Sequence, residues 1–155
     1  MLRSIAVISV LAANGCGGDG GTLPSDASYV AILAGTNEIP PRSTAGSGTA
    51  TFLVHGGMAT YQVAVSNLSA PATLVHVLIG GRGVVGLVIA RLPLAAATGE
   101  IATGAIDLRA PITFNNTTIS GDSLRALFEN GNAYVNVYTA TYPGGEVRGQ
   151  ISRVP

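Results

Sequence analysis

The chain has 155 residues, of which 47% are hydrophobic and 10% are charged, with eight basic residues balancing eight acidic ones. This composition excludes a largely disordered chain, because the apolar residues are enough to bury one core. It also excludes the basic stripe that attracts phosphates, so no nucleic acid partner is expected. The only cysteine, Cys16, excludes an intramolecular disulfide framework.

Residues 1–15 have the layout of a secretory signal peptide. Arg3 supplies a positive charge, residues 5–13 form an apolar run, and small residues precede Cys16. The run is much shorter than the roughly 20 residues that cross a bilayer, so a transmembrane helix is not expected. The segment resembles a bacterial lipoprotein signal, although Ala13 and Asn14 depart from the usual residues. We therefore expect Cys16 to be lipidated; an ordinary cleaved signal is the alternative.

Residues 16–28 are rich in Gly and small polar residues, which predicts a flexible tether after the lipidated cysteine. Residues 29–155 then remain as a single folded domain. Attachment through several acyl chains would hold this domain stably on a membrane. The expected location is extracytoplasmic, either anchored in the bacterial cell envelope or secreted if Cys16 is not lipidated.

From Tyr29 onward apolar and polar residues alternate with the period of β-strands. Residues 48–68 predict a hairpin with a two-residue Gly-Gly turn at 56–57. Its inward-facing residues are Ala50, Phe52, Val54, Tyr61, Val63 and Val65. Residues 73–81 and 84–93 are apolar on both faces, which predicts two central strands.

In the next stretch, residues 100–108, Ile101 and Thr103 are expected to face opposite to Glu100 and Ala102. The pattern becomes helical at residues 120–131, where Leu124, Leu127 and Phe128 share one face. The residues expected to begin and end this helix are Ser120 or Asp122 and Gly131.

Residues 134–151 predict a final hairpin with a Pro-Gly-Gly turn. One face buries Val135, Val137, Val147 and Ile151, and the other face carries Tyr134, Asn136, Tyr138, Glu146, Arg148 and Gln150. Seven or eight short strands with one short helix predict an all-β fold, an antiparallel β-sandwich or Greek-key barrel.

Several motifs together resemble the CHRD domain, a module named after chordin and found in many secreted bacterial proteins. They are GTNEIPP (35–41), GTATF (48–52), YQVAVSNLS (61–69), LVHVLIG (74–80) and NAYVNVYTATYPGGEVRGQI (132–151), with the Leu-rich helix before the last. The resemblance covers about Tyr29 to Arg153. It implies an immunoglobulin-like β-sandwich or barrel with some likeness to Cu/Zn superoxide dismutase, and it implies no assigned activity.

The family pattern commonly carries a His-x-His pair and a third His on a neighbouring strand, which together would suit copper or zinc. In this chain His76 remains, whereas Leu78 and Tyr138 occupy the other two positions. One imidazole and a neutral phenol make a poor first-row metal site. No metal is therefore expected, with His76 the remaining candidate, and the favoured role for His76 is a partly buried side chain bonded to a backbone carbonyl or to Tyr138.

A polar cluster of His76, Asn136, Tyr138, Glu146 and Arg148 is either a ligand site or a structural clasp, and the clasp is the favoured interpretation. No Ser-His-Asp order and no paired carboxylates indicate catalysis, so no catalytic residue, cofactor or enzymatic activity is expected. The Gly-rich residues 80–86 precede no helix, which predicts a variable loop for a partner and excludes a phosphate cradle.

Three functional hypotheses follow. The leading one is a lipid-anchored, non-enzymatic envelope module that binds a protein or glycan through its loops. The second is a metal-binding module like superoxide dismutase with a degenerate histidine site, using His76 with Tyr138 and Glu146. The third is a passive structural spacer.

Overall fold

The computed structural model describes residues 26–155. The predicted signal peptide, Cys16 and most of the predicted tether lie outside the described residues, so those interpretations stay predictions. Within residues 26–155 no helix combines the length and the apolar character that crossing a membrane requires.

Nine antiparallel strands of the described chain form one sheet in the order β5–β4–β9–β10–β1–β2–β3–β6, with β11 paired to β1. Its strands are β1 (Ala27–Ala34), β2 (Ser47–His55), β3 (Met58–Ser66), β4 (Ala72–Ile79), β5 (Val88–Arg91), β6 (Gly99–Asp107), β9 (Ala133–Thr139), β10 (Val147–Gln150) and β11 (Ser152–Arg153). A small separate hairpin consists of β7 (Ile112–Phe114) and β8 (Thr117–Ile119). The short elements η1 (Gly35–Asn37) and α1 (Gly121–Glu129) complete the fold.

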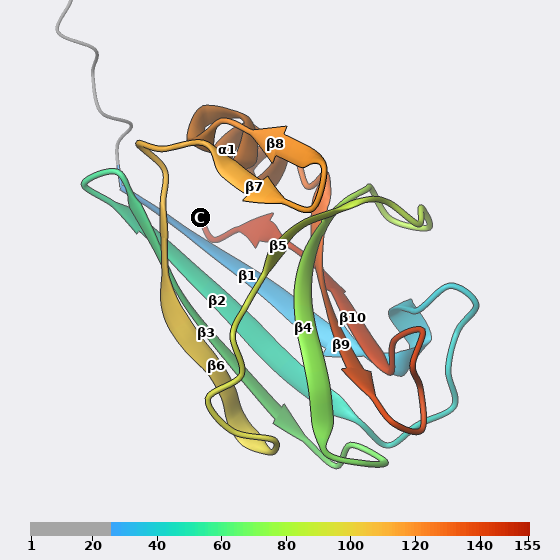
Figure 1. The fold of residues 1–155 in the computed structure, drawn as a ribbon. Coiled ribbons are helices and arrows are strands. Elements are labelled where there is room, and N and C mark those ends of the chain that lie inside the picture. Colours follow the sequence, from blue (N-terminus) through green and yellow to red (C-terminus); the bar gives the residue numbers. More distant parts are fainter. Residues whose placement is uncertain (1–25) are drawn as a thin grey trace, which may run out of the picture.

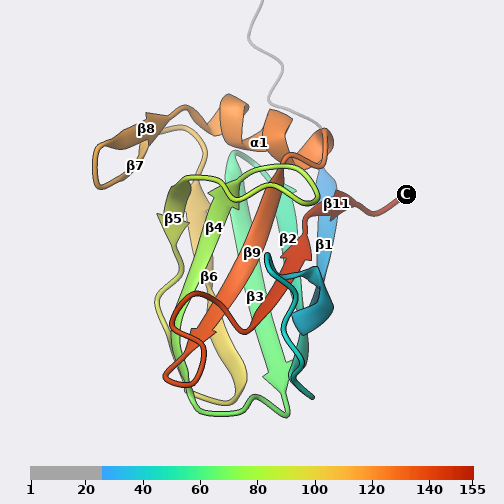
Figure 2. The ribbon, with the colours of Figure 1, turned by 90° about the vertical axis from the view of Figure 1, so that its right-hand side faces the viewer.

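The large sheet curls around its own apolar face (Figure 1). In the second view α1 and the β7–β8 hairpin lie together at one end of the curled sheet (Figure 2). The prediction of an antiparallel all-β fold with one short helix is confirmed, and the architecture is consistent with a β-sandwich. The core is enclosed by the bending of one continuous sheet, because β10 and β1 join what would otherwise be two separate layers. The immunoglobulin-like strand arrangement stays a prediction.

The β2–β3 hairpin follows its predicted register, with His55 opposite Met58 and Phe52 opposite Tyr61. Gly56 and Gly57 have φ values of 56° and 80°, the left-handed conformation that a tight hairpin turn requires at both positions. All six residues predicted to face inward are buried: Ala50, Phe52, Val54, Tyr61, Val63 and Val65. The alternation of apolar and polar residues therefore predicted this hairpin correctly.

Two strand predictions are wrong in detail. Residues 84–93 do not form a central strand, because β5 covers only Val88–Arg91 at the sheet edge and residues 84–87 lie in an exposed loop. In β6 a bulge shifts the pairing with β3, so that Ile101 and Ala102 are both buried and Thr103 is exposed. A bulge inserts one unpaired residue and so interrupts the alternation of faces.

The helix α1 begins where the sequence predicts, since the Ser120 hydroxyl accepts a hydrogen bond from the Ser123 amide at 3.1 Å. Phe128 packs against the rings of Tyr29 and Phe52, with centroid distances of 5.4 and 5.0 Å. The Tyr29 hydroxyl donates to the Glu129 carboxylate at 2.6 Å. These contacts fix the helix on one end of the core, where it shields the aromatic residues from water.

Candidate functional site

The outer face of β4, β9 and β10 carries a layer of polar and aromatic side chains. Asn136 on β9 lies opposite His76 on β4 and opposite Arg148 on β10, so the sheet register brings these three residues into one row. Asn136 and Arg148 are buried although they face away from the apolar core. The loops that cover this face therefore need hydrogen-bond partners from it.

Arg148 is a clasp for the loop of residues 80–87, which we call the display loop. Its Nη2 donates to the carbonyl oxygens of Gly81 and Val84 at 3.0 and 2.9 Å. The guanidinium also lies over the Tyr134 ring, 3.5 Å from its centroid. The planar cation thus satisfies loop carbonyls on its edge and an aromatic ring on its face.

Gln150 and Tyr134 complete this clasp. The Gln150 Nε2 lies 2.7 Å from the carbonyl oxygens of both Gly80 and Gly131. The Tyr134 hydroxyl accepts a hydrogen bond from the Gly86 amide at 3.1 Å. Both ends of the display loop are therefore fixed by side chains of β9 and β10.

Glu146 is a second clasp, separate from Arg148. Its carboxylate is fully buried and accepts hydrogen bonds from the Thr44 hydroxyl, the Ser69 amide and hydroxyl, and the Thr139 hydroxyl at 2.7 to 2.8 Å. Burial acts to raise the pKa of Glu146, but these hydrogen bonds outweigh it and hold the pKa below its usual value. An ionised carboxylate here joins three segments that are far apart in sequence.

His76 and Tyr138 meet through their rings, whose centroids are 5.2 Å apart with an edge-on orientation. The His76 Nδ1 atom is buried and has no hydrogen-bond partner among the described residues, so the expected bond to Tyr138 or a carbonyl is not made by that atom. Burial, followed by the charge of Arg91, lowers the pKa of His76, and burial raises that of Tyr138 to about 12. Both side chains are thus neutral near pH 7.

The hypothetical metal site consists of His76, Tyr138 and Glu146, and these side chains do not form one cluster of metal ligands. The Glu146 oxygens are engaged by Thr44, Ser69 and Thr139. Within residues 26–155 no three His, Cys, Asp or Glu side chains lie close enough together to hold a metal ion.

Glu38 is the residue that sequence reasoning missed. It follows η1, it is only 5% exposed, and its Oε1 atom has no hydrogen-bond partner in the described structure. The Oδ1 atom of Asn136 is likewise buried and unpartnered, and both oxygens lie beside Gly145, where a β-carbon would come within 2.7 Å of either. Burial raises the pKa of Glu38 to about 7, although Arg148 and Arg42 oppose the shift. The only signal in the sequence was an acidic residue inside a Pro-rich loop.

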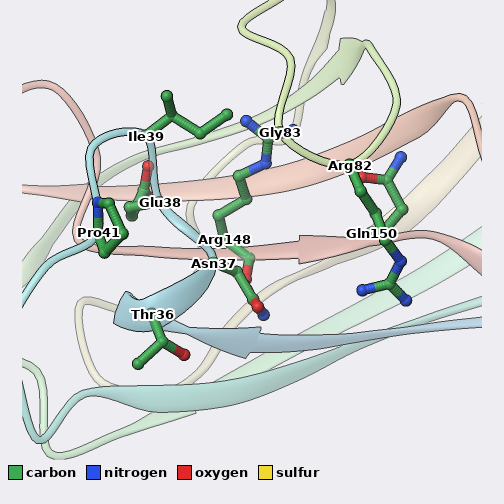
Figure 3. Close-up of a pocket in the computed structure, with 9 residues that line it drawn as sticks. All are labelled: Thr36, Asn37, Glu38, Ile39, Pro41, Arg82, Gly83, Arg148 and Gln150. Carbon is green, nitrogen blue, oxygen red and sulfur yellow. The ribbon is translucent and has the colours of Figure 1, made fainter.

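Glu38 lines a pocket of about 340 Å³ between the loop of residues 35–42, which we call the proline loop, and the display loop. Figure 3 shows Glu38, Ile39 and Pro41 along one side, Arg82 and Gln150 on the other, and Arg148 between them. The pocket therefore lies on top of the Arg148 clasp and combines one carboxylate with two guanidinium groups.

The fold and this face define an antiparallel β module whose outer polar side chains fasten its loops. A family model for the CHRD domain matches residues 29–151, so the chain belongs to the CHRD family, as its motifs predicted. CHRD domains are β-sandwich modules of the extracellular type. No curated protein and no solved structure matches the chain.

Replacing Glu146 by Gln should lower the free energy of unfolding at pH 7 by about 2 to 3 kcal/mol, because an amide nitrogen cannot accept the hydrogen bonds that one carboxylate oxygen receives. Urea unfolding of both proteins measures this difference. The exposed Glu100 gives the matched control, and Glu100→Gln should change the value by about 0.5 kcal/mol or less. Equal effects of the two substitutions would contradict the clasp.

The stability that Glu38 contributes to the folded protein should decrease as the pH rises. Its pKa in the folded state, about 7, lies above the ordinary value of 4.5, so its contribution to stability is fully present below pH 4.5 and is lost as the pH rises through 7. The loss should be on the order of 3 kcal/mol. Urea unfolding from pH 4.5 to 8 should show this decline in the original protein relative to Glu38→Gln; parallel curves would disprove it.

Proposed function

We propose that the protein is a non-enzymatic, lipid-anchored module of the bacterial cell envelope that binds a protein or glycan partner through the display loop and the proline loop. The observation that carries this proposal is a firmly held loop with an apolar outer surface. Val84, Val85 and Leu87 are 51%, 69% and 67% exposed, although the loop backbone is fixed by side chains of β9 and β10.

This combination favours binding over a purely structural role. Loops that only connect strands gain nothing from three exposed aliphatic side chains within four residues, because each exposes apolar area to water. A rigid loop loses little conformational entropy on association, so its apolar side chains retain more of their binding free energy. The adjoining pocket adds polar groups that can distinguish one partner from another.

The location in the envelope is supported by two independent features. CHRD domains belong to the extracellular type of module, and the N-terminal residues resemble a lipoprotein signal that ends at Cys16. The predicted tether would connect the lipid to β1, which begins at Ala27, two residues before the predicted start of the domain. A passive spacer would share this location, so the binding experiment must separate the two roles.

Lipidation predicts a mature protein that begins at Cys16 and carries diacylglycerol on its sulfur. Mass spectrometry of the protein purified from membranes should find this mass, and Cys16→Ser should move the protein from the membrane fraction to the soluble fraction. An unmodified mature N-terminus at any other residue would refute the anchor while leaving the binding proposal intact.

Binding through the display loop predicts that the double variant Val85→Ser, Leu87→Ser loses its partner. The experiment is quantitative capture from envelope extract on immobilised full mature chain carrying Cys16→Ser, with bound proteins and glycans identified. The variant Ile32→Ser, Leu53→Ser is the matched control, since these residues are also exposed aliphatics, at 62% and 50%, on β1 and β2.

We expect at least tenfold less of the specific partner on the display-loop variant, equivalent to about 1.4 kcal/mol or more, and unchanged capture on the control. If both variants retain the same molecules as the original chain, or if the original chain captures nothing, the display loop is not a binding surface and the spacer hypothesis is favoured.

A further inference from the structure

We infer that the pocket between the proline loop and the display loop is a subsite for a carboxylate group of the partner, which Arg82 and Arg148 bind through their guanidinium groups. This inference rests on the proposed function and gives the chemistry by which the partner is recognised. A carboxylate can belong to an acidic side chain of a protein or to a uronic acid of a glycan, and the titration described below separates the two sources.

Arg148 is a buried cation without a counter-ion. Its side chain belongs to a residue that is only 3% exposed, and it forms no ion pair with any of the described residues. A charge removed from water is costly unless hydrogen bonds and an opposite charge replace the lost hydration. The carbonyl oxygens of Gly81 and Val84 and the Tyr134 ring replace part of it. A bound anion would supply the opposite charge that is missing.

Arg148 also keeps hydrogen-bond donors that the clasp does not use. Nη2 is the atom that holds the display loop, whereas Nε and Nη1 make no hydrogen bond within residues 26–155. Neither of these two atoms is fully enclosed by the protein. The side chain lines the pocket and lies between its two walls (Figure 3). A guanidinium presents its donors in a planar fork that matches the two oxygens of a carboxylate.

Arg82 is the second cation of the pocket. It is exposed, it lines the wall formed by the display loop, and it has no hydrogen bond or ion pair with the described residues. Its neighbours Gly80 and Gly81 are held by Gln150 and Arg148. The backbone that carries Arg82 is therefore fixed, while its guanidinium remains available to a group that enters the pocket.

The charge of the lining favours a single negative charge on the ligand. Two guanidinium groups and the Glu38 carboxyl give the lining a formal charge of +1 with Glu38 ionised (2 − 1) and +2 with Glu38 protonated. Burial raises the pKa of Glu38 to about 7, and its Oε1 atom lies against Asn136 and Gly145, which are not part of the lining. Glu38 thus does not cancel the two cations, and a carboxylate balances them better than a neutral group or a doubly charged phosphate.

The positive charge is a local feature of this pocket, because the chain as a whole has a formal net charge of zero. The pocket volume of about 340 Å³ is at the lower end of the range of small-molecule sites, roughly 300–1,000 Å³. It therefore suits one acidic side chain or one acidic sugar unit. Ile39 and Pro41 line the side of Glu38 and can contact the carbon atoms of that unit (Figure 3).

The test is an NMR titration of the full mature chain carrying Cys16→Ser with two matched pairs of probes. Glucuronic acid is compared with glucose, and N-acetylaspartate methylamide with N-acetylasparagine methylamide, so that each pair differs in the carboxylate. At least one carboxylate probe should bind with a Kd of about 5 mM or tighter, at least fivefold tighter than its neutral match. The Nε–H signals of Arg82 and Arg148 should shift with those of residues 36–41. Preference for glucuronic acid would assign a glycan partner, and preference for the aspartate probe a protein partner.

Arg82→Gln should weaken this binding at least fivefold. Arg91→Gln is the matched control, because it removes the same charge from an exposed arginine that does not line the pocket, and it should leave binding unchanged. Unfolding curves that show Arg82→Gln to be as stable as the original chain separate lost contacts from lost folding. The inference is overturned if no carboxylate probe binds, if each neutral probe binds as tightly as its match, if inorganic phosphate alone binds, or if the two arginine variants have equal effects.

The outcomes also distinguish this inference from the proposed function. Loss of partner capture by the display-loop variant together with no carboxylate binding would retain a binding module and reject the subsite. Carboxylate binding without any effect of the display-loop variant would retain the subsite and reject the display loop as the main contact.

Discussion

Every buried backbone polar group needs a hydrogen-bond partner, and this requirement governs the outer face of β4, β9 and β10. Loops cover this face, and irregular loops cannot satisfy their own carbonyl and amide groups. Arg148, Gln150 and Tyr134 therefore donate to or accept from the display loop. The protein in effect has an apolar core inside the curled sheet and a second, polar core outside it, and the second one determines where the loops lie.

Two buried carboxylates show how local donors decide the chemistry of one residue type. Glu146 is surrounded by hydroxyl and amide donors, which favour the ionised form and lower its pKa in spite of burial. Glu38 is nearly as buried but has an oxygen without a donor, and its pKa rises to about 7 even with Arg148 nearby. The well-supplied carboxylate of Glu146 is stabilised in its ionised form, whereas burial stabilises the neutral form of Glu38.

The pocket beside Glu38 shares Arg148 with the display loop. Arg148 holds the display loop from below and at the same time lines the pocket above. A partner that touches the exposed side chains of the display loop thus lies next to the pocket. Two residues of β10, Arg148 and Gln150, both hold the display loop and line the pocket.

The sequence by itself determined the parts that depend on neighbours along the chain. Alternation of apolar residues predicted the β2–β3 hairpin, helical spacing and Ser120 predicted α1, and the ordered motifs predicted the CHRD family. It also predicted that Asn136 and Arg148 share one face, since a short hairpin fixes their register.

Only the tertiary structure decided which distant segments meet. The bulge beside Ile101, the edge position of β5 and the separation of Glu146 from Arg148 depend on pairings between strands that no local pattern specifies. The burial of Glu38 depends on Asn136 and Gly145, which lie beside its carboxylate although they are far away in the sequence. The periodicity of a strand predicts which of its faces lies against the apolar core. The burial of a polar group and the hydrogen-bond donors around it are decided only when remote segments of the chain pack together.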